Sequence, residues 1–193
     1  CIQIAYFYVN SINKNTMKKI LLGMAALGLF IYSCKSSTSS TTDDSKKVGI
    51  HFESKSGSKV EGTAVFIEKN GVVSLEAKLT GLDPGVHAIH IHEKADCSSA
   101  DASSAGGHWN PTFKKHGKWG ETECHKGDIG NFTANVDGEA TVLFKTDEWC
   151  IGCEDKTKDI LGKGLIVHQK PDDYVTQPTG DAGARVACSA IIK

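Results

Sequence analysis

The octapeptide Gly85–His92, GVHAIHIH, restricts the folds open to this chain more than any other stretch. Apolar and polar residues alternate in its second half, which is typical of a β-strand with one buried face. Ile89 and Ile91 would point to one side of the strand, and His90 and His92 to the other. Two imidazoles about 6 to 7 Å apart on one face form half of a transition-metal site. The strand therefore borders a hydrophobic core on one side and a metal-binding cluster on the other.

The other histidines lie mostly after this strand. Seven of the eight histidines fall between residues 87 and 168. His87 shares the face of the two isoleucines, so we expect a structural role for it beneath the site. Imidazole and carboxylate groups are ligands for zinc and copper. Five further candidate ligands lie in or beside Gly-rich connections: His108, His116, His125, Asp128 and His168.

Short runs of alternating apolar and polar residues fill the chain from Val48 onward. Asn70-Gly71, between two such runs, is a strong hairpin signal, because both residues tolerate positive φ. Eight or so short strands separated by turn signals indicate an antiparallel sandwich or barrel. The predicted strands cover residues 48–53, 59–68, 73–80, 85–92, 131–136, 139–144, 165–168 and 185–192.

The segment 95–130 has no strand pattern and is unusually long for a loop in a compact domain. Its two tryptophans, two cysteines and three histidines favour an ordered, functional loop over a disordered one. Bound metal would hold such a loop in place. Shorter irregular segments follow at 146–164 and 169–184.

Composition narrows the class of protein. A hydrophobic fraction of 39% suits one globular domain with an appendage. The net charge of −1 argues against a nucleic-acid partner, because nucleic-acid-binding domains usually carry a basic face.

The N-terminal segment is typical of an export signal rather than of a folded domain. Met17 begins a basic stretch, and the apolar run 20–31 is too short to span a bilayer comfortably. The following Ile-Tyr-Ser-Cys34 resembles a bacterial lipoprotein signal, in which the cysteine is lipidated and becomes the new N-terminus. We therefore expect upstream translation without a structural role at 1–16, a lipoprotein signal peptide at 17–33, lipidated Cys34 with a flexible polar tether at 34–46, and one domain at 47–193.

This resemblance also implies a location. The protein would be lipid-anchored to a membrane of the bacterial cell envelope, on the periplasmic or outer-surface side. The run 35–45, almost entirely Ser, Thr and Asp, cannot bury apolar area and would act as the tether. Disulfides persist in such an oxidising compartment.

Residues 47–193 contain an ordered series of motifs: Gly85-x-His-x-x-His-x-His92, Gly106-Gly-His-Trp-Asn-Pro111, His116, His125-Lys-Gly-Asp-Ile-Gly-Asn131, His168 and Gly183-Ala-Arg-Val-Ala-Cys188. Together these motifs resemble the copper/zinc superoxide dismutase family. The resemblance implies an eight-stranded antiparallel Greek-key β-barrel, or sandwich, with long metal-binding and electrostatic loops.

The resemblance also implies both cofactors, copper and zinc. His108 would bridge the two metals, and Asp172 resembles the carboxylate that links a copper-ligand histidine to a zinc-ligand histidine. Three imidazoles and one carboxylate suit tetrahedral zinc, while an imidazole-rich set suits copper. The implied copper ligands are His90, His92, His108 and His168, and the implied zinc ligands are His108, His116, His125 and Asp128.

The activity implied by this family is the dismutation of superoxide to oxygen and hydrogen peroxide. Copper would cycle between Cu(II) and Cu(I), zinc would be structural, and His108 would take up a proton during the cycle. Arg185 is the only arginine in the chain and would attract and orient the small anion. The alternative for Arg185 is an ordinary surface arginine at a strand start.

We expect four of the cysteines to form two disulfides. The family resemblance implies a disulfide between Cys97 and Cys188. Cys150-Ile-Gly-Cys153 departs from the family pattern, and we expect a local disulfide there, with a zinc or copper docking site as the alternative. A thioredoxin-type redox role would need a βαβ context that is absent. Cys124 is left as a free thiol or an accidental soft ligand near zinc.

The alternative function is a non-enzymatic copper-binding or metal-buffering lipoprotein on the same fold. Cys124 and the Cys-x-x-Cys pair support it, whereas the presence of every catalytic-type residue argues against it. A purely structural sandwich would leave the histidine cluster unexplained. The expected partners are superoxide as substrate and a membrane that receives the lipid anchor; a homodimer stays open.

Overall fold

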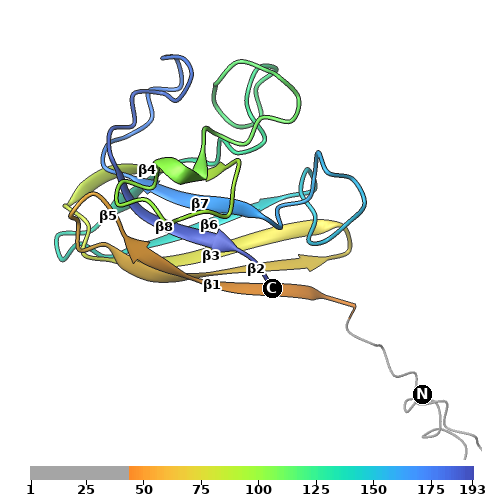
Figure 1. Ribbon diagram of the computed structural model, residues 1–193, viewed down its shortest axis with the longest axis horizontal. Coiled ribbons are helices and arrows are strands. Elements are labelled where there is room, and N and C mark those ends of the chain that lie inside the picture. The colour runs from red at the N-terminus through yellow and green to blue at the C-terminus, as the bar shows by residue number, and fades with distance from the viewer. Residues whose placement is uncertain (1–43) are drawn as a thin grey trace, which may run out of the picture. The chain divides into compact units, whose positions relative to one another are not determined.

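The computed structural model describes residues 44–193. The predicted signal peptide, Cys34 and most of the tether therefore lie outside the described residues. Strand β1 begins at Lys46, one residue before the predicted start of the domain. The elements are β1 Lys46–Ser54, β2 Glu61–Lys69, β3 Val72–Thr80, β4 Gly85–His92, the 3-10 turn η1 Ser103–Ala105, β5 Gly130–Ala134, β6 Ala140–Thr146, β7 Lys163–His168 and β8 Arg185–Ile191 (Figure 1).

The strands form one antiparallel sheet in the order β5-β4-β7-β8-β1-β2-β3-β6. Its two end strands, β5 and β6, lie in contact without ladder pairing, so the sheet curls into a nearly closed barrel. The chain crosses the barrel twice, from β3 to β4 and from β6 to β7, because neither pair is adjacent in the sheet. These crossings give the Greek-key arrangement, and the predicted all-β, eight-stranded fold is confirmed.

Alternation in the sequence sets which side chains enter the barrel. On β3, Val73, Leu75, Ala77 and Leu79 are all buried, while the residues between them are exposed. Strand β3 follows β2 directly through Asn70-Gly71, whose φ angles of 53° and 76° suit a tight two-residue hairpin turn. The predicted hairpin is therefore present.

Strand β4 has one face in the barrel core and the other on the outside of the barrel. Ile89 and Ile91 belong to the barrel core, together with Leu165 and Val167 of the neighbouring β7. Because β4 and β7 pair with His90 opposite Ile166, the residues between these core positions point to the outer side of the barrel. His90, His92 and His168 lie there and are nevertheless buried, so the loops must cover them. In Figure 1 the green and dark blue loops project from this part of the barrel.

Among residues 44–193, no helix has the length and apolar character needed to cross a membrane.

Candidate metal centre

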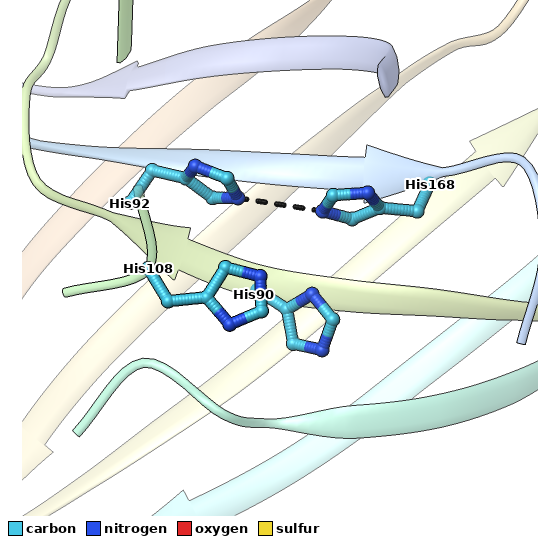
Figure 2. Close-up of side chains that lie close together, drawn as sticks. All are labelled: His90, His92, His108 and His168. Carbon is cyan, nitrogen blue, oxygen red and sulfur yellow. Dashed lines mark hydrogen bonds between the residues drawn. The ribbon is translucent and has the colours of Figure 1, made fainter. Parts of the chain in front are cut away.

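Four histidines from three segments converge outside the barrel wall. His90 and His92 come from β4, His168 ends β7, and His108 follows η1 in the long loop. A short β-bridge between His92 and His108 brings that loop against the end of β4. One ring nitrogen from each of the four lies within 4.8 Å of the others. Figure 2 shows the four rings gathered together, with His92 Nε2 and His168 Nε2 facing each other at 3.3 Å.

A second cluster adjoins the first and shares one histidine with it. Its ligand atoms also lie within 4.8 Å of one another. Asp128 is its centre: Oδ1 lies 2.8 Å from His108 Nδ1 and 3.2 Å from His125 Nδ1, and Oδ2 lies 3.0 Å from His116 Nδ1. The members are His108, His116, His125 and Asp128, all buried.

Unpartnered ring nitrogens show that these clusters suit metal ions. Buried polar atoms in folded proteins almost always have a hydrogen-bond partner, so each exception needs an explanation. Within residues 44–193, the buried side-chain atoms without one all belong to the two clusters: Nδ1 of His90, His116, His125 and His168, and Nε2 of His108.

The two donor sets differ in the way copper and zinc require. The first set has four imidazoles and no carboxylate, which suits copper, whereas the second has three imidazoles and one carboxylate, which suits tetrahedral zinc. His108 contributes to both sets, with Nδ1 next to Asp128 Oδ1 and Nε2 without a partner. The Nδ1 atoms of His116 and His125 lie close to the carboxylate oxygens of Asp128, but not in hydrogen-bond geometry. Ligand atoms that bind the same cation are arranged in this way.

Asp172 connects the two clusters from behind. His90 Nε2 donates to its Oδ2 and His116 Nε2 donates to its Oδ1, both at 2.9 Å. Each imidazole thus holds a proton on Nε2, so Nδ1 is the atom of each ring that a metal ion would take. Gly180 packs directly on this carboxylate: a Cβ there would lie 1.8 Å from Asp172 Oδ1, so no other residue fits. The family resemblance implied a carboxylate that links a histidine of each set, and Asp172 lies between His90 and His116.

The protonation states also suit metal binding. Burial, with the nearby His108 and the other histidines, holds the pKa of His92 well below its usual value, and burial does the same for the pKa of His168. Both rings are therefore neutral at pH 7, as a ligand must be. Burial would lower the pKa of His116 as well, but the neighbouring carboxylates of Asp128 and Asp172 outweigh it and raise that pKa to about 9. In the metal-free chain His116 therefore stores a proton that a bound cation would displace.

The long loop is fastened to β4 by backbone pairing. Strand β5 pairs with β4 only as far as Ile89, and beyond that point the loop takes its place. Ile91 N donates to Gly127 O at 2.9 Å, and Trp109 N donates to Ile91 O at 2.8 Å. Gly127 is required here, because a Cβ would lie 2.1 Å from Ile91 O. This pairing places His108 and Asp128, the neighbours of Trp109 and Gly127, over the β4 histidines.

Arg185 lies at the start of β8 and is half-buried. Its Nη1 donates to the carbonyl of Ala102 at 2.7 Å. The disulfide between Cys97 and Cys188 ties the same loop to β8. Under this loop a small apolar cluster forms, separate from the barrel core: Ala102, Ala105, Ile166 and Cys188, with Cys97 beside it.

The remaining predicted residues, three cysteines and His87, lie outside the two metal clusters. Cys150 and Cys153 form a disulfide within their own loop, and Cys124 is a free, partly exposed thiol. His87 is buried beneath the site, and its ring contacts the carbonyls of His168 and Asp83. It belongs to neither metal cluster.

Sequence reasoning missed several groups that support the ligands. The carbonyl of Gly106 accepts from His92 Nδ1 at 3.0 Å and so fixes Nε2 as the free nitrogen of that ring. The Gln177 side chain pairs with both backbone groups of His116 at 2.9 Å. Backbone carbonyls have no sequence signal at all, and a glutamine in a polar loop looks like any surface residue.

Comparisons with known proteins agree with this geometry. The family described as copper/zinc superoxide dismutase (SODC) matches residues 60–191. The protein "Superoxide dismutase [Cu-Zn] 2" of Mesembryanthemum crystallinum is 37% identical over 139 residues, which cover 68% of this chain and 86% of that one. "Superoxide dismutase [Cu-Zn]" of Caulobacter vibrioides is 39% identical over 137 residues, which cover 69% of this chain and 79% of that one.

A solved structure gives the same result for the fold. The crystal structure of the clock protein EA4 superposes with a TM-score of 0.66 at 30% sequence identity. The match covers 76% of this chain and 94% of that one. By its sequence, its barrel and its two adjoining ligand clusters, the chain belongs to the copper/zinc superoxide dismutase family.

Proposed function

We propose that this protein catalyses the dismutation of superoxide to oxygen and hydrogen peroxide at a paired copper and zinc centre. The observation that carries the proposal is the pair of clusters joined at His108, which together hold all the buried side-chain atoms without a hydrogen-bond partner in the described part of the chain, residues 44–193. Copper would be held by His90, His92, His108 and His168, and zinc by His108, His116, His125 and Asp128.

Copper, when bound, supplies the one-electron couple by which superoxide is alternately oxidised and reduced. The chain contributes a proton carrier and an anion guide to this chemistry. Burial, followed by the neighbouring His90, lowers the pKa of His108 to about 3, so the ring is neutral at pH 7 and keeps a lone pair. His108 Nε2 is the atom suited to take up a proton during the cycle, because no hydrogen bond engages it.

The direct test of this function is superoxide disappearance with the full-length protein loaded with both metals. Copper and zinc are quantified on the same sample. A rate that scales with copper occupancy and falls with rising ionic strength supports an electrostatically guided enzyme. Full copper occupancy without turnover would instead support the alternative, a non-enzymatic copper-binding or metal-buffering lipoprotein.

Arg185→Ala is expected to lower the second-order rate constant about tenfold or more. The Arg185 guanidinium is a permanent cation, and alanine removes both its attraction for the anion and its ability to orient it. The measurement is the superoxide disappearance rate at low ionic strength. Arg185→Lys keeps the charge and should retain part of the rate. Equal rates for wild type and Arg185→Ala at low salt would contradict the anion-guiding role.

The anchored location is also part of this proposal. The Ile-Tyr-Ser-Cys34 motif and the polar run after it support a lipoprotein held in the bacterial envelope, on the periplasmic or outer-surface side. The disulfides Cys97–Cys188 and Cys150–Cys153 fit an oxidising compartment. Assembly as a homodimer stays a prediction, and sedimentation of the purified protein tests it.

Cys34→Ala is expected to release the protein from the membrane fraction, because it removes the thiol that would receive lipid. The measurements are incorporation of labelled palmitate and fractionation of cells that express the full chain. Cys124→Ala is the matched control, since it removes a free thiol outside the signal. If Cys34→Ala still incorporates palmitate and fractionates with membranes, the lipoprotein assignment is wrong.

A further inference from the structure

The turn between β1 and β2 contains an unusual lysine. Lysine side chains normally keep the ammonium group in water, yet Lys55 is only 9% exposed. A buried ammonium is costly unless it is paired. Here Lys55 Nζ donates to the Cys97 carbonyl and to Glu53 Oε2, the latter at 3.0 Å. The lysine therefore joins the turn to the loop that the Cys97–Cys188 disulfide anchors.

The same turn contacts this loop and β8 at further points. Ser56 N donates to the Ala100 carbonyl at 2.8 Å, and Lys55 N donates to the Val186 carbonyl at 2.9 Å. Ser56 Oγ donates to the Arg185 carbonyl at 2.9 Å. Two successive positive φ angles, 53° at Ser56 and 72° at Gly57, turn the chain tightly enough to present these groups together.

These contacts hold Arg185 from both of its ends. Its backbone is fixed by Ser56 Oγ, and its guanidinium is fixed by the Ala102 carbonyl. The loop that presents this carbonyl is in turn held at Cys97 by Lys55 and at Ala100 by Ser56. Arginine has a long side chain with many rotamers, so a site that needs one orientation has to restrict it.

We infer that Lys55 and Ser56 are positioning residues for Arg185, setting the direction in which its guanidinium meets an anion at the copper cluster. The inference rests on the proposed anion-guiding role of Arg185. It assigns the β1–β2 turn, far from the metal ligands in sequence, to substrate guidance. Neither residue belongs to the ligand clusters, so metal loading should not depend on them.

The test uses full-length protein loaded with copper and zinc, and azide as a small anion in place of superoxide. Azide binding is followed through the charge-transfer absorption of the copper(II) form. Lys55→Met keeps the length of the side chain and removes the ammonium. We expect the azide dissociation constant to rise about threefold to tenfold, the loss of a charge-assisted hydrogen bond, with unchanged copper and zinc content. Lys55→Arg, which keeps the cation, should restore part of the affinity.

Lys59→Met is the matched control, because it removes the same charge from an exposed position later in the same turn. Equal weakening by Lys55→Met and Lys59→Met would reduce the effect to general electrostatics and overturn the inference. If Lys55→Met does not load both metals, Ser56→Ala takes its place, since it removes only the contact to the Arg185 carbonyl. Unchanged azide affinity in the variant that loads would then overturn the inference.

A double-mutant cycle with Arg185→Ala separates this inference from the proposed function. If Lys55 acts through Arg185, Lys55→Met has no further effect on azide binding once Arg185 is alanine. Additive effects would overturn the positioning role. If Arg185→Ala alone leaves azide affinity unchanged, the anion-guiding role of Arg185 fails. If Arg185→Ala weakens azide binding and Lys55→Met does not, only the positioning role fails.

Discussion

His168→Ala is expected to abolish superoxide dismutation while most zinc binding is retained. His168 belongs to the copper cluster and not to the zinc cluster. Its ring faces His92 across the first cluster (Figure 2), so alanine removes one of four nitrogen donors and leaves a gap beside another. The Asp128 cluster keeps all of its ligand atoms. Loss of a ligand should therefore lower copper affinity strongly and leave the second site assembled.

The measurement is the copper and zinc content of the variant after loading with stoichiometric amounts of both metals. His125→Ala is the reciprocal control, because His125 belongs only to the zinc cluster. It should lose zinc in preference to copper. If His168→Ala lost both metals to the same extent, the assignment of two separable sites would be wrong.

Much of the barrel could be predicted from the sequence because its strands obey one simple rule. Each strand has one face in the core, so alternation on β3 and the Asn70-Gly71 turn predict both strands and register. Strand ends differ by one or two residues: the predicted strands 131–136 and 139–144 are β5 Gly130–Ala134 and β6 Ala140–Thr146 in the structure. The Greek-key arrangement came from the family resemblance, since alternation does not encode which strands pair across a crossing.

The ligand residues of the site could be predicted from the sequence, but most of the groups that orient them could not. Histidine is rare and chemically distinct, so the predicted ligands could be found as residues. The Gly106 carbonyl that orients His92 and the Ala102 carbonyl that orients Arg185 are main-chain atoms. Every residue has a carbonyl, so the sequence does not single these two out. Lys55 was missed because a lysine after a strand usually lies in solvent. Its burial and the two hydrogen bonds of its ammonium group distinguish it from an ordinary surface lysine.

The acceptor groups behind the ligand histidines all act in the same way: they fix the tautomer of the ring. A metal-binding imidazole needs one nitrogen protonated and engaged, so that the other presents a lone pair. The Gly106 carbonyl does this for His92 and Asp172 does it for two rings at once. Asp172 thereby couples the two clusters, which otherwise share only His108. Its burial would raise the pKa of the carboxyl, but the hydrogen bonds from His116 and His90 outweigh burial and lower that pKa, so it remains ionised.

Asp172→Asn is expected to lower the affinity of the protein for copper about 10- to 100-fold, with a smaller effect on zinc. An amide has one oxygen acceptor and one NH₂ donor, whereas the carboxylate accepts on both sides. Asp172 Oδ1 accepts from both His116 Nε2 and Tyr174 N, while Oδ2 accepts from His90 Nε2 alone. The amide oxygen should therefore take the Oδ1 place, and its NH₂ group should face His90.

Two donors would then oppose each other, and His90 can relieve the clash by moving its proton from Nε2 to Nδ1. That Nδ1 is one of the unpartnered ring nitrogens of the copper cluster, so the new tautomer loses the lone pair that binds copper. His116 keeps an acceptor and its tautomer. The measurement is competition for each metal with a chelator of known affinity. Asp173→Asn is the control, because it removes the same charge from the adjacent exposed residue. A greater loss of zinc than of copper would contradict the tautomer argument.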